Sequence, residues 1–176
     1  MATSWKVTQP GFVGAQPITD VSTVKNHELG TTVKAVDTGS TAYGEGEFIY
    51  CAGVASTVAG SVVVIDTVSH TTSLADADAA ASSCGPVALA VSANVASRYG
   101  WYQIFGTGVA KVLASFADNK PCFLTATGGS IDDAVVDGHG INGMTSASAI
   151  GTPASGQALV NLAYPSCQDV GDDTAD

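Results

Sequence analysis

Asp37, Thr38 and Gly39 are the residues whose types and spacing come closest to a catalytic motif. In aspartic proteases an Asp-Thr-Gly loop follows a strand and presents a carboxylate, and two such aspartates share one proton. The sequence contains the motif once, so this chemistry would require a dimer in which the Asp37 side chains of two copies meet. Asp and Gly are also common turn formers, and a strand followed by a turn is the simpler interpretation. A dimeric aspartic protease acting through Asp37 is therefore a remote alternative.

A group of acidic residues near position 135 is the densest set of candidate metal ligands. It comprises Asp132, Asp133, Asp137 and His139. A Ca²⁺ or Mg²⁺ loop gathers several oxygen ligands in one turn. Residues 134–136 read Ala-Val-Val and are predicted to form a short strand, which would point the acids apart. We expect no metal site here.

The other motifs give little support for cofactor binding, catalysis or metal binding. Residues 138–143 read GHGING and match the G-x-G-x-x-G spacing of dinucleotide-binding loops, but a poor helix former follows and the next acid is Asp169. Histidine and cysteine have no catalytic or zinc-binding spacing, and we expect free, mostly buried thiols at Cys51, Cys84, Cys122 and Cys167. The sequence thus predicts a protein that is not an enzyme and needs no cofactor.

The charge balance limits the possible partners. Six Lys and Arg face sixteen Asp and Glu, a formal net charge of −10. A surface this acidic repels phosphate, so we expect no nucleic-acid and no membrane partner. The N-terminal sequence lacks the basic and apolar regions of a secretory signal, and apolar runs are short. We expect synthesis in a cytoplasm.

The elements that position these residues are predicted to be strands. Gly, Ser, Thr and Val are abundant, and short β-rich segments alternate with turn residues. Strands are predicted at residues 31–36, 47–50, 61–65, 87–91, 102–105, 109–114, 122–126 and 158–164. Residues 74–83 fit a short helix or a loop. The expected fold class is all-β, a compact β-barrel or β-sandwich with an extended N-terminal arm and little helix.

Three regions follow from this pattern: an arm at 1–30, a β domain at 31–165 and an acidic flexible tail at 166–176. Early Pro and Gly residues make the arm extended, so its apolar side chains must be buried against another part of the protein or against a partner. The arm either wraps its own domain or lies on a neighbouring subunit. Its candidate interface residues are Trp5, Phe12, Val13 and Ile18.

Residues 98–106 read RYGWYQIFG and hold four aromatic residues. As a strand, this segment would be apolar on both faces, which fits burial on both sides or cover by another subunit. A platform for stacking nucleic-acid bases would have neighbouring basic residues, which are scarce here. Trp101 and Tyr102 are therefore candidates for a core or a subunit interface, and a sugar site stays open as an alternative.

Three runs of sequence resemble small virion proteins of tailed bacteriophages, which are encoded beside the major capsid protein. They are YGEGEFIYCAGVAST at residues 43–57, the segment 85–119 around the aromatic residues, and ATGGSIDDAVVDG at residues 126–138. The resemblance covers about residues 27–165 and rests on strand sequences, with no catalytic residue to carry over.

The resemblance implies a structural role, decoration or cementing of the outer capsid surface across neighbouring capsomers. The implied partners are the major capsid protein and other copies of this chain, with a trimer favoured. The implied location is the virion exterior, after synthesis in the host bacterial cytoplasm. The alternative from another class is a carbohydrate- or receptor-binding virion module that uses Trp101 and Tyr102.

Overall fold

The computed structural model describes residues 4–10, 12, 14–39, 43–77, 85–136 and 138–167. This part of the chain is nearly all β, which confirms the predicted class. Its twelve strands are β1 (Trp5–Val7), β2 (Val21–Ser22), β3 (Thr32–Asp37), β4 (Glu45–Ala52), β5 (Val62–Ile65), β6 (Thr72–Leu74), β7 (Val87–Ala90), β8 (Tyr99–Lys111), β9 (Pro121–Leu124), β10 (Ile131–Asp132), β11 (Gly140–Ser146) and β12 (Gln157–Cys167).

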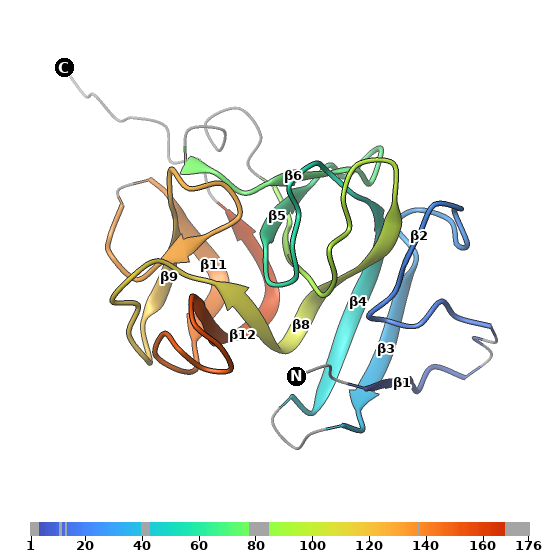
Figure 1. The fold of residues 1–176 in the computed structure, drawn as a ribbon, viewed down its shortest axis with the longest axis horizontal. Helices are drawn as coiled ribbons and strands as arrows, with labels where there is room; N and C mark the ends of the chain where they lie inside the picture. The colour runs from blue at the N-terminus through green and yellow to red at the C-terminus, as the bar shows by residue number, and fades with distance from the viewer. Residues whose placement is uncertain are drawn as a thin grey trace.

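The strands form one antiparallel sheet that is not closed into a barrel. Its main path runs β1-β3-β4-β8-β12-β11-β9-β10, while β7 and β5 branch from β8 and β2 pairs with its start. In Figure 1, β8 crosses the centre between β1, β3 and β4 on one side and β9, β11 and β12 on the other. The long strand β8 therefore joins the two halves of the molecule.

The predicted strand at 102–105 and the first part of the one predicted at 109–114 belong to one continuous strand, β8, which ends at Lys111. The glycines between them continue the strand rather than form a turn, since Gly106 and Gly108 pair in regular register with Leu162 and Val160 of β12. A bulge precedes them at Ile104. Glu47 pairs with Phe105 and Phe48 with Gln103, so one residue of β8 is extra at this point. Gly106 has a φ of 93°, and a Cβ there would collide with the carbonyl oxygen of Glu45. Only glycine fits this close approach.

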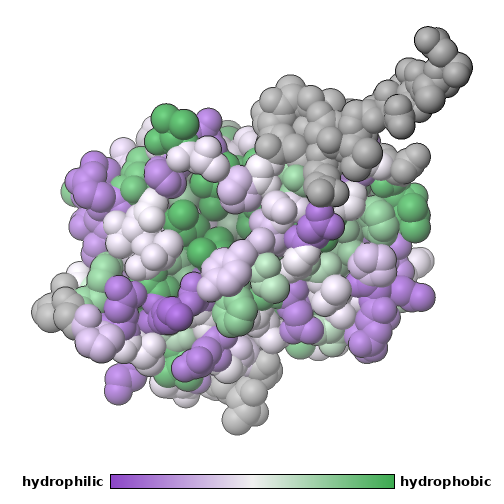
Figure 2. Space-filling model, turned by 180° about the vertical axis from the view of Figure 1, so that it is seen from behind, coloured by the Kyte–Doolittle hydropathy of each residue, from purple (hydrophilic) through white to green (hydrophobic). Residues whose placement is uncertain are grey.

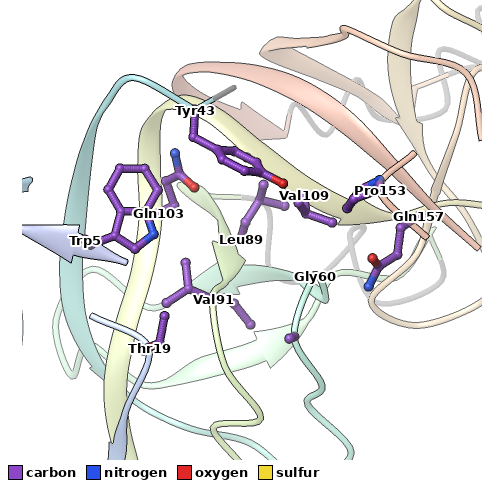
Figure 3. Close-up of a pocket in the computed structure, with 13 residues that line it drawn as sticks. Trp5, Thr19, Tyr43, Gly60, Leu89, Val91, Gln103, Val109, Pro153 and Gln157 are labelled. Carbon is purple, nitrogen blue, oxygen red and sulfur yellow. The ribbon is translucent and has the colours of Figure 1, made fainter. Parts of the chain in front are cut away.

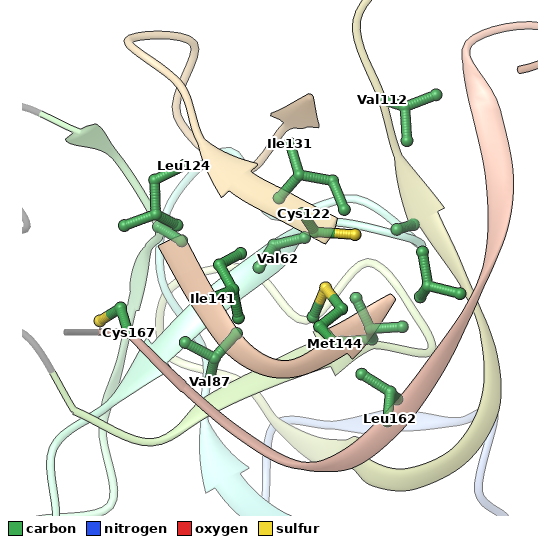
Figure 4. Close-up of a cluster of buried hydrophobic side chains, with 14 of the residues drawn as sticks. Val62, Val87, Val112, Cys122, Leu124, Ile131, Ile141, Met144, Leu162 and Cys167 are labelled. Atoms are coloured by element: carbon green, nitrogen blue, oxygen red, sulfur yellow. The ribbon is translucent and has the colours of Figure 1, made fainter. Parts of the chain in front are cut away.

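Three buried clusters fill the space around β8. One lies between β3, β4 and β8 and includes Phe48, Tyr50 and Trp101. A smaller one, around Tyr102, lies between β4, β5, β7 and β8. The largest spans the other half of the molecule, and Figure 4 labels Val62, Val87, Val112, Cys122, Leu124, Ile131, Ile141, Met144, Leu162 and Cys167 in it. Side chains from β8 enter all three clusters.

Gln16 ties the N-terminal segment to its own domain. Its carbonyl accepts a hydrogen bond from Trp101 Nε1 at 2.9 Å, and its Oε1 accepts from the Tyr50 hydroxyl at 3.0 Å and from Asn26 Nδ2 at 2.8 Å. Its Nε2 donates to the carbonyl of Asp20 at 2.8 Å. β1 and β2 add strand pairs with β3 and β8. The described part of the arm thus lies on the chain's own domain.

Several elements differ from those predicted. β1, β2, β6, β10 and β11 had no predicted counterpart. The segment 134–136, predicted as a strand, is irregular, and Val135 is 79% exposed, because no neighbouring strand pairs with it. β12 continues through Ser166 and Cys167, two residues assigned to the tail. Residues 168–176 and most of the predicted helix or loop at 74–83 lie outside the described residues.

We expect replacement of Trp101 by Ala to lower the free energy of unfolding by about 3–5 kcal/mol. The side chain is completely buried, and its removal leaves both a cavity and an unpaired Gln16 carbonyl. Urea unfolding of Trp101→Ala beside wild type measures the loss. Val68→Ala, at a position that is 89% exposed, is the control and should change the value by less than about 0.5 kcal/mol. Wild-type stability in Trp101→Ala would contradict this packing.

Candidate functional site

The structure places three of the six candidate interface residues inside the chain's own core. Ile18, Trp101 and Tyr102 are 2%, 0% and 0% exposed. They offer a partner no surface in this conformation, because their partners are side chains and backbone of the same chain. Trp5 and Phe12 are partly buried against the cluster that contains Ile18 and Trp101. Val13 lies outside the described residues.

Asp37 ends β3 beneath the start of the chain. Its Oδ1 accepts a hydrogen bond from the Gly39 amide at 2.9 Å, and its buried Oδ2 has no hydrogen-bond partner among the residues that the structure describes. The amide and hydroxyl of Thr38 both donate to the carbonyl of Ser4, at 2.7 and 2.8 Å. The Asp-Thr-Gly segment is thus held against its own N-terminal strand, although a dimeric protease would need it to face a second copy.

The acidic group near position 135 does not converge. Asp132 Oδ1 accepts a hydrogen bond from the next amide, and His139 Nε2 lies 2.9 Å from the carbonyl of Ala77. Asp137 lies outside the described residues. In the described part of the chain, no three His, Cys, Asp or Glu residues are placed to hold a metal ion.

Three cysteines are free and buried, as the sequence predicts: Cys51, Cys122 and Cys167. Burial raises the pKa of the Cys51 and Cys122 thiols to about 12, so both are protonated at neutral pH. A protonated, buried thiol is a poor nucleophile. Cys84 lies outside the described residues.

The best candidate site is an apolar pocket where β4, β5, β8 and β12 meet. Its volume is about 300 Å³. Figure 2 shows an apolar hollow, with hydrophilic residues around it, on the face turned away in Figure 1. The pocket is lined by Ile49, Ile65, Thr67, His70, Pro86, Val87, Ile104, Tyr164, Pro165 and Ser166. These described lining residues include no carboxylate and no Lys or Arg, so the pocket fits an apolar group.

Two residues of this pocket have a strained backbone. His70 and Tyr164 have φ values of 51° and 50°, in the left-handed region, which His adopts more often than most residues and a bulky residue such as Tyr rarely does. The four other non-glycine residues with positive φ among those described are small or polar: Ser56, Ser97, Ser115 and Asn119. Such strain costs about 1–3 kcal/mol for each residue and is concentrated at functional sites. Two such residues lie in the lining of this one pocket, which makes the pocket a candidate functional site.

The strain at Tyr164 arises from a bulge in β12. Leu162 pairs with Met144 and Ser166 with Asn142, so three residues of β12 face one residue of β11. Pro165, within the bulge, has no amide hydrogen to donate. The irregularity turns the Tyr164 side chain outwards, where it is 58% exposed.

Tyr164 and Phe105 form an exposed aromatic pair beside the pocket. Their ring centroids are 5.3 Å apart, and Phe105 is 39% exposed. The Tyr164 hydroxyl donates to Glu47 Oε2 at 2.8 Å, and Lys34 Nζ lies 2.6 Å from Glu47 Oε1. We call Phe105, Tyr164 and the pocket lining the Tyr164 surface. It combines apolar area with a fixed polar edge, as protein-binding surfaces do.

The polar edge sets the protonation states there. The hydrogen bond from Lys34 lowers the pKa of Glu47 against the opposing effect of burial, and the bond from Tyr164 adds to it. The same contact raises the pKa of Tyr164, because its hydroxyl donates to a carboxylate. At neutral pH Glu47 is therefore an anion and Tyr164 is neutral, and both hold the aromatic pair in place.

Sequence reasoning did not identify the Tyr164 surface. The segment 158–164 is predicted as a strand, and nothing in it shows that its last residue turns outwards. Pro165 is the one available signal, since proline within a strand indicates a bulge or an edge.

No protein-family model, curated protein or solved structure matches the chain. Among the described residues, no helix has the length and apolar character needed to cross a membrane.

We predict that Glu47→Gln lowers the melting temperature at neutral pH but not in acid. A carboxylate with a lowered folded-state pKa contributes stability above its ordinary pKa of 4.5, and this contribution is lost as the pH falls through the lowered value. Thermal unfolding at about pH 7 and about pH 3 tests this.

Glu28→Gln is the matched control, because Glu28 pairs with Lys25 on an exposed surface and its side chain is 85% exposed. It should leave the melting temperature at neutral pH unchanged. If Glu47→Gln and wild type melt together at neutral pH, the polar edge does not stabilise the fold.

Proposed function

We propose that the chain is a non-enzymatic capsid decoration protein of a tailed bacteriophage, which docks on the outer shell through the Tyr164 surface. The observation that carries this proposal is an exposed aromatic pair beside an apolar, backbone-strained pocket. Exposed apolar patches of this kind typically serve in protein binding. Tyrosine is one of the residue types enriched among those that dominate binding energy once a partner covers them.

The choice of a capsid as partner rests on the sequence runs that resemble small virion proteins. The Tyr164 surface draws on two of these runs, since Ile49 lies in the first and Ile104 and Phe105 in the second. The acidic composition also supports a position outside the shell, away from packaged DNA.

The pocket indicates which part of the capsid protein it would accept. Its volume and apolar lining fit one or two aliphatic or aromatic side chains from a capsid loop. Phe105 and Tyr164 would cover that loop from one side, while Glu47 and Lys34 would form a polar rim. A trimer of this chain would present three such surfaces, so that weak single contacts sum to tight binding.

Binding to the assembled shell alone would stabilise that shell by mass action. The proposed role is therefore mechanical. The chain adds contacts between capsomers and performs no reaction.

We expect Tyr164→Ala to weaken binding to purified empty shells by roughly thirtyfold, about 2 kcal/mol, as for an interface hot spot. The shells are those of the phage that encodes the chain, and cosedimentation of shells with increasing protein gives the affinity. Tyr164→Phe should keep most of the affinity, because it retains the ring. Val135→Ala, an exposed aliphatic position outside the Tyr164 surface, is the control.

Two results would contradict the proposal. If the shells sediment without the wild-type chain, the capsid is not its partner. Wild-type affinity in a correctly folded Tyr164→Ala would show that docking uses a different surface.

A further inference from the structure

A second cavity opens between β1, β7, β8 and the segments that precede β4 and β12. Its volume is about 320 Å³, at the lower end of the range of about 300–1,000 Å³ found for small-molecule sites. It shares no lining residue with the Tyr164 surface. We call it the Trp5 groove, and Figure 3 labels Trp5, Thr19, Tyr43, Gly60, Leu89, Val91, Gln103, Val109, Pro153 and Gln157 around it.

The described lining of the Trp5 groove contains no Asp, Glu, Lys, Arg or His. This is notable in a chain with a net charge of −10. An ionic ligand would find no opposite charge inside the groove, and an anion would also be repelled by the protein as a whole. The groove therefore fits a neutral ligand.

Three polar side chains in the groove are available to a ligand. Gln103 Nε2 donates to the carbonyls of Phe105 and Thr107, at 3.1 and 3.0 Å. These bonds fix the amide and leave its Oε1 as an acceptor. The Tyr43 hydroxyl and the Gln157 amide have no hydrogen-bond partner among the described residues, and Figure 3 shows them pointing into the cavity.

These groups match a ligand rich in hydroxyls. An amide both donates and accepts, and the Tyr43 hydroxyl does the same. Burial raises the pKa of Tyr43, with a further contribution from Asp37, so its hydroxyl keeps its proton at neutral pH. Sugar hydroxyls can donate and accept in turn, so each of the three protein groups can be satisfied.

Aromatic rings form one end of the groove. Trp5 and Tyr43 have centroids 6.4 Å apart with planes tilted by 56°. Phe48 supports the Trp5 ring in an edge-on contact at 4.8 Å. Such rings pack against the C–H face of a sugar, while the polar groups bind its hydroxyls.

Gly108 lets two side chains of the groove, Leu89 and Gln103, pack directly against the backbone of β8. A Cβ there would lie 2.7 Å from Leu89 Cδ1 and 2.8 Å from Gln103 Oε1, distances that real Cβ atoms essentially never show. A larger residue at position 108 would displace both side chains, so the glycine keeps Gln103 in its place in the lining of the groove.

We propose that the Trp5 groove binds a neutral saccharide of one or two rings. The rings of Trp5 and Tyr43 pack against the sugar, and Gln103, Gln157 and the Tyr43 hydroxyl bind its hydroxyls. This site is independent of the proposed docking on a capsid and lies apart from the Tyr164 surface. It replaces Trp101 and Tyr102, the fully buried residues first considered for a sugar site, with residues that line a cavity.

Saturation-transfer NMR with lactose, maltose and chitobiose tests the proposal on the full-length protein. At least one of these neutral disaccharides should receive saturation from the protein. The sialylated form of lactose should bind about tenfold more weakly than lactose if lactose is the ligand, because its carboxylate finds no cation in the groove.

Variants then locate the site. Gln157→Ala and Tyr43→Phe each remove polar groups with little loss of packing, and each should weaken binding about tenfold. Tyr164→Ala, on the other surface, should bind the sugar as wild type does. No saturation transfer to any of the three disaccharides, or equal binding in both groove variants, would overturn the proposal.

Discussion

The pairing of β8 with four other strands is the constraint on which the rest of the structure depends. β2, β4, β7 and β12 all pair with this one strand, and its side chains enter all three buried clusters. It also supplies Gln103 and Gly108 to the Trp5 groove and Ile104 to the Tyr164 surface. A change in its register would alter both proposed sites together.

Both sites lie where the regular sheet is interrupted. The bulge at Ile104 lies where β8 changes from pairing with β4 to pairing with β12, and the bulge in β12 exposes Tyr164. Regular strands would bury or evenly space these side chains. The strain at Tyr164 and His70 is tolerated because buried strands on either side hold the backbone in place.

Local patterns predicted much of the fold and little of the sites. β-branched and apolar residues marked most long strands, and the two apolar faces around Trp101 favoured a core, where the structure places it. The continuity of β8 was missed, because glycine marks turns and bulges alike. Trp5 and Tyr43 meet only through the pairing of β1 with β3, and the exposure of Tyr164 depends on β11. Such contacts between distant segments leave no local pattern.

The central claim is that the Tyr164 surface docks on the outside of a capsid. Electron cryomicroscopy of virions of the proposed source phage tests it most directly. The account predicts density for the chain on the outer shell, with Phe105 and Tyr164 against the capsid protein. A shell without this density, or a bound chain whose Tyr164 faces solvent, would contradict it.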